Sequence, residues 1–210
     1  MKRKLMFYSL LFLSLITFSQ CKKEVIPPNS PVDELAFTDA EKAIVFNNSR
    51  DSALRVLNYF IYADSLILRK QSRNVSFNDT ATLFYLTDRM YKSVITEGGV
   101  GIAAPQVGIN RDIIWVQRYD KGSLSSHPWE VYFNPVITQY SDTLKQRSDG
   151  CLSIPGMSGL SWRAIWVNVE YDLPDGSHHA EHISQAYTAH IFQHEIDHLN
   201  GIVWLDRVNQ

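Results

Sequence analysis

The nine residues at positions 193–201 constrain this chain more than any other stretch, because they contain the pattern His-Glu-x-x-His. In a helix, His194 and His198 lie one turn apart on the same face, where both imidazoles can bind one metal ion. Glu195 then lies beside that ion and can accept a proton from a bound water. The pattern therefore indicates a hydrolytic metal site on a C-terminal helix.

The flanking residues favour a helix at this position. Residues 186–192 contain no glycine or proline, and Gly201 follows at a point where a helix commonly ends. An alternative is that two histidines spaced four residues apart simply line a core helix and bind nothing. The spacing alone does not decide between these interpretations.

A catalytic metal of this kind usually has three protein ligands and one open position for water. Cys151, in the sequence Asp-Gly-Cys-Leu-Ser at 149–153, is the candidate for the third ligand, because the only other cysteine is Cys21. A lone thiol is more commonly a small buried hydrophobic group. Gly150 before the cysteine and Ile-Pro-Gly at 154–156 indicate instead a sharply turning segment.

A third stretch, at residues 98–108, is rich in glycine and alanine. Small residues allow another backbone or a ligand to approach closely. No Gly-Lys-Ser/Thr follows, so this stretch is not a phosphate-binding loop. Taken alone it is a weak signal.

The three motifs together, in this order, resemble the peptide deformylase family. That family carries Gly-x-Gly-x-Ala-Ala-x-Gln, then Glu-Gly-Cys-Leu-Ser, then Gln-His-Glu-x-Asp-His. The corresponding residues here are 99–106, 149–153 and 193–198. The resemblance spans residues 50–208 and extends to Asp-Arg-Met at 88–90 and Phe-Asn-Pro at 133–135.

The resemblance implies a metal-dependent hydrolase that removes the formyl group from formyl-methionyl peptides and releases formate. It assigns one divalent ion, Fe²⁺ or Zn²⁺ with Ni²⁺ or Co²⁺ as alternatives, to Cys151, His194 and His198. The expected catalytic residues are Glu195 as the base, with the Gln106 side chain and the Leu152 backbone N–H as oxyanion donors. The residues expected along the substrate are Val100, Gly101, Gly150 and His190.

Two positions depart from the family pattern. Asp149 stands where the family usually has glutamate, and Ser158 stands where many members have arginine. Both belong to the shell that supports the metal ligands, where changes typically cost about 10- to 100-fold in activity or metal affinity. Arg163 is a candidate ion-pair partner for this shell.

The remaining histidines admit more than one interpretation. His190 lies one helical turn before His194, so it can line the substrate pocket beside the metal or act as a further ligand. Because a water position must stay open, we expect it to line the pocket. His178, His179 and His182 could form a second metal site, although an exposed polar turn is the favoured interpretation.

Patterns along the chain predict an α+β fold with mixed, mostly antiparallel sheets packed around the C-terminal metal-binding helix. A short helix at 38–50 is expected to be capped by Thr38, and 54–68 to be partly helical. A longer helix from residue 78 ends at 98–99 and buries the stripe Leu83, Leu86, Met90 and Val94. Strands are expected at 112–117, 131–133, 164–171 and 179–185, the second ending at Asn134-Pro135.

The first residues resemble an export signal. Residues 1–20 combine a basic start with an apolar run that is short for a membrane span, and Cys21 follows as in a bacterial lipoprotein. Gln20 departs from the small residue usual before a lipidated cysteine. An uncleaved anchor and a cytoplasmic protein are the alternatives. Residues 21–35 would then be a lipid-anchored, proline-rich tether, and 36–210 the catalytic domain of an extracytoplasmic, membrane-anchored enzyme.

Composition sets further limits. With 210 residues the chain holds one domain and a tail, and its net charge of −2 gives no reason to expect nucleic acid. We expect a monomer without a disulfide, because lipid and metal would occupy the two cysteines. Two other functions stay open: a different His-Glu-x-x-His metallohydrolase, and a non-catalytic lipoprotein that binds formyl-peptides or metal.

Overall fold

The computed structural model describes residues 35–123 and 126–208, which lie in one compact unit spanning Glu34–Gln210. The expected signal peptide, Cys21 and the tether lie outside the described residues. The helices and strands follow the order α1 (Asp39–Val45), α2 (Tyr62–Leu68), α3 (Thr80–Thr96), β1 (Gly101–Ala103), η1 (Ala104–Val107), β2 (Ile113–Gln117), β3 (Trp129–Tyr140), β4 (Leu144–Gly150), β5 (Ser158–Ala164), β6 (Val167–Asp172), β7 (His178–Ile183), α4 (Ala186–Leu199) and η2 (Trp204–Asp206). None of the described helices is both long and apolar enough to cross a membrane.

The strands form two antiparallel sheets. One has five strands in the order β1-β2-β3-β6-β7, and the other is the β4–β5 hairpin. Outside these strands, the bridge between Arg73 and Arg111 is parallel. Strand β1 lies at an edge of the larger sheet, which leaves its outer side unpaired within that sheet. The α+β prediction is confirmed.

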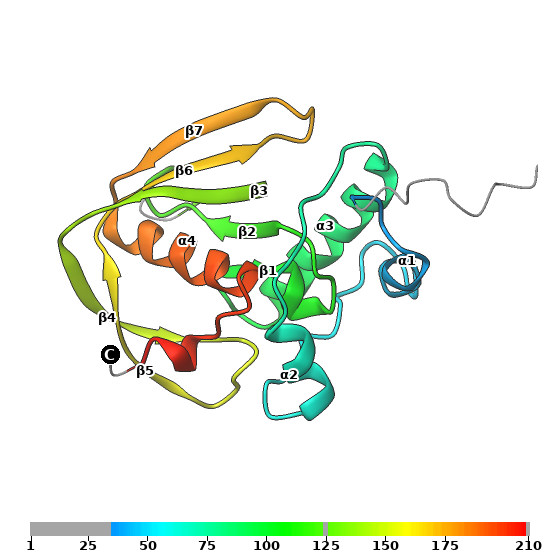
Figure 1. Cartoon of the computed structure of the whole chain (residues 1–210), viewed down its shortest axis with the longest axis horizontal. Coiled ribbons are helices and arrows are strands. Elements are labelled where there is room, and N and C mark those ends of the chain that lie inside the picture. The colour runs from blue at the N-terminus through cyan, green and yellow to red at the C-terminus, as the bar shows by residue number, and fades with distance from the viewer. Residues whose placement is uncertain (1–34, 124–125, 209–210) are drawn as a thin grey trace, which may run out of the picture. The chain divides into compact units, whose positions relative to one another are not determined.

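Helix α4 packs between the five-stranded sheet and the β4–β5 hairpin (Figure 1). Its apolar side chains Phe192 and Ile196 join a core with Ile114, Val167 and Val169 of the sheet. On the hairpin side, the Gln193 side chain both donates to and accepts from the Ala164 backbone, at 2.9 and 3.0 Å. These contacts on both sides fix the helix that carries the metal motif.

The ends of α4 follow the sequence signals. Gln185 caps the first turn by accepting a hydrogen bond from the Thr188 N–H at 2.6 Å. Gly201 has φ +71° just after the last turn, and a Cβ there would lie 2.5 Å from the Arg69 carbonyl oxygen. A glycine is therefore required at this position by both conformation and space.

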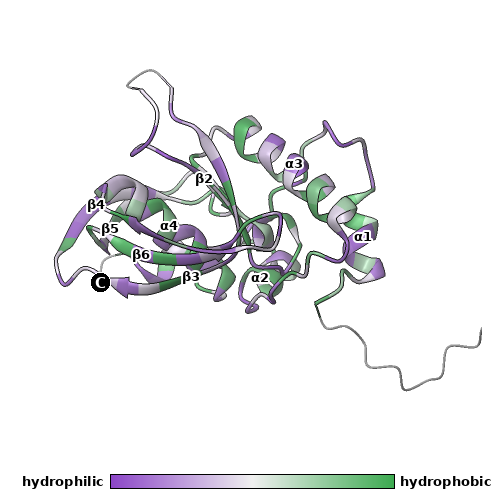
Figure 2. Cartoon of the chain, turned by 90° about the horizontal axis from the view of Figure 1, so that it is seen from above, coloured by the Kyte–Doolittle hydropathy of each residue, from purple (hydrophilic) through white to green (hydrophobic). Residues whose placement is uncertain are grey.

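Helix α3 packs on β1 and β2 of the larger sheet, and α1 packs against α3. The predicted stripe Leu83, Leu86, Met90 and Val94 of α3 is fully buried, and green and purple bands alternate along this helix in Figure 2. Asp79 caps α3 by accepting from the Thr82 N–H at 3.1 Å. Thr38 caps α1 in a reciprocal capping box with its third helical residue. The segment 54–68 is helical only over α2.

The prediction that Asn134-Pro135 ends a strand is wrong. Strand β3 continues through both residues to Tyr140, with a shift of register against β6 between Phe133 and Val136. Asn134 has φ +50°, and its side chain bonds to Val75 and Asp172. The Asn134 side chain thus supplies hydrogen bonds at the point where the register shifts, and the strand continues through an irregularity instead of ending there.

Other strand predictions also change. The expected strand at 164–171 corresponds to β6, which begins only at Val167, because Ala164 is the last residue of β5. Strand β7 spans His178–Ile183 rather than 179–185. The β4–β5 hairpin and the short strand β1 were not expected, and the residues of β4 are mostly polar and exposed and show no apolar alternation.

We predict that Asn134→Ala destabilises the fold by about 3 kcal/mol, because it removes three hydrogen bonds and leaves alanine at a positive φ. Chemical denaturation of both proteins measures this difference. Thr138→Ala, on an exposed part of the same strand, is the control and should change stability by less than about 0.5 kcal/mol. Equal stability of the two variants would contradict a structural role for Asn134.

Candidate metal centre

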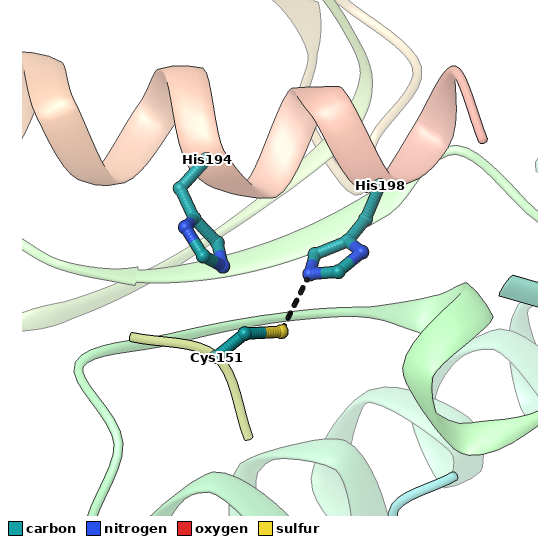
Figure 3. A group of neighbouring side chains, drawn as sticks. All are labelled: Cys151, His194 and His198. Atoms are coloured by element: carbon teal, nitrogen blue, oxygen red, sulfur yellow. Dashed lines mark hydrogen bonds between the residues drawn. The ribbon is translucent and has the colours of Figure 1, made fainter. Parts of the chain in front are cut away.

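Cys151, His194 and His198 converge on one buried point (Figure 3). The two histidines project from one face of α4 toward the cysteine, which follows β4. The Cys151 Sγ lies 3.2 Å from His198 Nε2, and ligand atoms of all three residues lie within 4.8 Å of one another. Among the described residues, this is the group of His, Cys, Asp and Glu side chains whose positions suit a metal ion.

These three side chains fit a tetrahedral metal site. Metal bonds of about 2.3 Å to sulfur and about 2.1 Å to nitrogen place neighbouring ligand atoms roughly 3.5 Å apart. The 3.2 Å between Cys151 Sγ and His198 Nε2 lies below that value, and the upper limit of 4.8 Å for the whole group lies above it. One thiolate and two imidazoles are a donor set that zinc, iron, nickel and cobalt all accept.

The segment that carries the cysteine turns sharply, as the glycine and proline residues around it predict. The Ile154 N–H donates to the Cys151 carbonyl at 2.8 Å, and Gly156 has φ +76°. The Tyr59 N–H donates to the Ser153 carbonyl at 2.8 Å, which ties the turn to the segment before α2. The backbone that carries the thiol is therefore fixed by its own turn and by the contact with Tyr59.

The Asp149 carboxylate connects β4 to α4. Its Oδ1 lies 3.0 Å from His194 Nδ1, and its Oδ2 accepts from the Ser161 hydroxyl at 2.8 Å. With Nδ1 engaged, the Nε2 of His194 is the nitrogen available to a metal. Burial opposes the charged form, but the close His190 and His194 rings hold the pKa of Asp149 well below its usual range. Aspartate thus reaches the metal ligand from a position where the family usually has glutamate.

Two arginines, Arg163 and Arg207, form ion pairs with Asp197 of the metal-binding helix. Arg163 forms an ion pair with Asp197 of α4, and its Nη2 lies 3.5 Å from the Asp149 Oδ2. Arg207 also pairs with Asp197, at 2.9 Å. The expected ion-pair role of Arg163 is confirmed. The partners Asp197, Ser161 and Arg207 were not identified from the sequence, because their contacts come from distant elements.

Glu195 is buried, and its Oε2 has no hydrogen-bond partner among the residues that the structure describes. Burial raises the pKa of Glu195 to about 7, which suits a group that must accept and release a proton near neutral pH. A bound cation would lower this value. A Cβ on Gly101 would lie 2.4 Å from the Glu195 Oε1. The glycine motif therefore makes room for this carboxylate.

Gln106 lies beside the cysteine. Its Oε1 accepts from the Ala103 N–H at 2.9 Å, which orients the amide. Its Nε2 then faces the Cys151 sulfur at 3.6 Å and the Ser153 hydroxyl at 3.4 Å. The fixed amide thus presents its N–H donors next to the candidate metal position.

A cavity of about 420 Å³ opens over the site. The predicted site residues that line it are Val100, Gly101, Gln106, Gly150, Cys151, Leu152, His190, His194 and Glu195. His198 is fully buried, and its ligand atom lies in the same group as those of Cys151 and His194. One cavity thus brings together the residues of all three sequence motifs.

The histidines of β7 take up other contacts. His178 pairs with Asp172 at 2.9 Å, and the His182 Nδ1 lies 2.6 Å from the Asn168 side chain. Both rings are exposed, and no metal-binding group forms there among the described residues. The residues are exposed and polar as expected, but they lie on strand β7 rather than on a turn.

The fold and the ligand geometry define a metal-dependent hydrolase. A family model described as polypeptide deformylase matches residues 57–210, and the chain belongs to that family. It is thus a hydrolase of the kind that removes formyl groups.

Similar proteins support this assignment. The peptide deformylase of Chloroflexus aurantiacus is 34% identical over 163 residues, which cover 73% of this chain and 86% of that protein. That of Desulforudis audaxviator is 37% identical over 142 residues, covering 67% and 86%. A class I type b peptide deformylase from Acinetobacter baumannii, solved with Met-Ala-Ser bound, is 33% identical and has a TM-score of 0.66 over 75% of this chain and 99% of its own.

We predict that Gly101→Ala keeps the bound metal but lowers kcat by at least about 100-fold, because the added methyl displaces the Glu195 carboxylate. Metal analysis together with steady-state kinetics separates these two effects. Full activity in this variant would show that Glu195 has room to move without loss of function.

Proposed function

We propose that this enzyme hydrolyses the formyl amide of formyl-methionyl peptides and releases formate and a free amino terminus. The observation that carries the proposal is one cavity lined by Glu195, Gln106, Cys151 and His194, with His198 completing the group of candidate metal ligands. The relative with Met-Ala-Ser bound supports a peptide as the occupant of the corresponding cavity.

Each residue has a distinct role in this reaction. A divalent ion held by Cys151, His194 and His198 would supply a Lewis acid and a water of lowered pKa. Glu195 accepts a proton from the water molecule that attacks the formyl carbon. The carboxyl group then returns the proton to the peptide nitrogen as the carbon–nitrogen bond breaks. Water thus adds across the amide, and formate and the amine account for all atoms.

Two donors stabilise the oxyanion that forms during attack. The Gln106 side-chain N–H is already oriented by its bond to Ala103, and the Leu152 backbone N–H belongs to a cavity-lining residue. One such donor is worth roughly 3 kcal/mol in the transition state.

The substrate backbone has an edge strand to pair with. Strand β1 has one unpaired side in its sheet, and Val100 and Gly101 line the cavity there. An extended peptide can add to such an edge through main-chain hydrogen bonds when no side chain blocks its approach. Gly150, which also lines the cavity, has no side chain that could obstruct the same peptide.

The native metal is Fe²⁺ or Zn²⁺ in this proposal, and Ni²⁺ or Co²⁺ would also support activity, because the Cys-His-His set accepts all four. An extracytoplasmic location favours zinc, since iron(II) is exposed to oxidation there.

We further propose that the enzyme is an extracytoplasmic lipoprotein anchored through Cys21. The support is the order of the first residues: a basic start, an apolar run, the cysteine and a proline-rich stretch. Nascent chains are absent outside the cytoplasm. Its substrates there would be free formylated peptides or formyl groups on exported proteins.

The purified protein is expected to release formate from formyl-Met-Ala-Ser. Glu195→Gln should keep the metal and lose at least about 1,000-fold in kcat, because the proton acceptor is gone. Cys151→Ala should lose both metal and activity. Metal analysis and formate assays measure these outcomes. Metal binding without formate release in the unmodified protein would favour a non-catalytic binding protein, and cleavage of unformylated peptides would favour a metallopeptidase.

Cell fractionation tests the location. The native protein should be found in the membrane fraction and be accessible to protease in spheroplasts. Cys21→Ser should release it from the membrane or leave it unprocessed, because the thiol that carries the lipid is absent. A native protein that is soluble in the cytosol with an uncleaved amino terminus would contradict export.

A further inference from the structure

The cavity extends from the metal ligands along one face of α4. Tyr187, His190 and His194 line it and follow one another at spacings of three and four residues. These spacings place the side chains on one helical face, about one turn or 5.4 Å apart. A group bound at the metal therefore has His190 as its neighbour toward the start of the helix.

His190 is a buried polar group without a satisfied hydrogen bond. The residue is only 3% exposed, and both ring nitrogens lack a well-formed hydrogen bond to any described residue. Its Nε2 lies 3.1 Å from the Asp149 Oδ2, close enough for an electrostatic contact but not aligned as a hydrogen bond. Buried polar groups in native proteins nearly always have a partner. Water or a ligand in the cavity can supply one, and a ligand that displaces that water must offer the ring a polar partner in its place.

Asp149 also limits how far His190 can move. The same carboxylate contacts His194 and accepts from Ser161, so it is itself fixed. The His190 ring therefore lies at a set position on the cavity wall, one turn from a metal ligand. A fixed polar group can discriminate between ligands, because a ligand without a complementary hydrogen-bonding group leaves it unpaired.

The proposed reaction places one substrate group near this ring. The Cβ of the first substrate residue is three bonds from the formyl carbon, which places it roughly 3.5 Å away. A side chain of glutamine or methionine length then spans roughly one helical turn. Such a side chain, when it runs along this face of α4 toward the start of the helix, has its end within reach of His190.

We propose that His190 determines specificity by favouring a first substrate residue whose side chain ends in a hydrogen-bonding group. This inference rests on the proposed function. A glutamine amide can both donate to and accept from an imidazole, a methionine sulfur is a weak acceptor, and norleucine offers nothing. The expected order of preference is glutamine, then methionine, then norleucine. Formyl-methionyl peptides thus remain substrates, and formylated peptides whose first side chain ends in a hydrogen-bonding group are better ones.

The test compares formyl-Gln-Ala-Ser with formyl-norleucine-Ala-Ser, whose first side chains have similar length. The unmodified enzyme should prefer glutamine by about 10-fold or more in kcat/KM, because norleucine leaves the imidazole unpaired. His190→Phe keeps a planar ring without nitrogen and should abolish or reverse the preference. His190→Gln restores hydrogen bonding and should retain it. Equal ratios in the unmodified enzyme and His190→Phe would overturn the proposal.

Binding of the product peptides separates this inference from the proposed reaction. Calorimetry with Gln-Ala-Ser and norleucine-Ala-Ser should show the same preference, and its loss in His190→Phe, whether or not formate is released. His182→Leu is the control, because His182 is exposed on β7 and does not line the cavity. Metal analysis of each variant confirms that its site is folded. If the phenylalanine ring prevents metal binding, His190→Leu is used in place of His190→Phe.

Discussion

The buried contact between Asp149 and His194 is the interaction on which the arrangement of this site depends. A carboxylate taken out of water is costly unless positive or donor groups compensate it. Here the imidazole of His194 and the Ser161 hydroxyl do so, at 3.0 and 2.8 Å. Because Cys151 follows Asp149 by two residues, the contact that orients one metal ligand also sets the position of another. The β4–β5 hairpin and α4 thus contact each other through the residues of the metal site and not only through apolar side chains.

The rest of α4 holds that contact in place. Its apolar face packs on the larger sheet, while Gln193 and Asp197 bond to Ala164, Arg163 and Arg207 on the hairpin side. Helix position is therefore fixed by packing on one side and by polar contacts on the other. Gly101 then leaves the space that Glu195 occupies. The reactive groups are thus held in place before a substrate binds, which is how enzymes reduce the entropic cost of the reaction.

Local signals in the sequence predicted the two longer helices and the Thr38 cap well, because caps, glycine stops and apolar spacing act over a few residues, whereas the two short helices are shorter than expected. The α3 stripe and the end of α4 at Gly201 are examples. These local signals could not predict contacts between residues that are far apart in the sequence. The carboxylate of Asp149 lies against His190 and His194 only because β4 pairs with β5 beneath α4, and β4 itself has a polar, exposed sequence. The roles expected of Gln106 and Leu152 came from family resemblance and could not have been derived from spacing alone.

The central claim is that Cys151 and two histidines of α4 hold one divalent metal. X-ray absorption at the metal edge of the purified protein measures the ligand atoms directly. The structure predicts one sulfur at about 2.3 Å and two imidazole nitrogens at about 2.0–2.1 Å, completed by oxygen from water. A coordination shell of nitrogen and oxygen without sulfur would contradict this ligand set and the role assigned to Cys151.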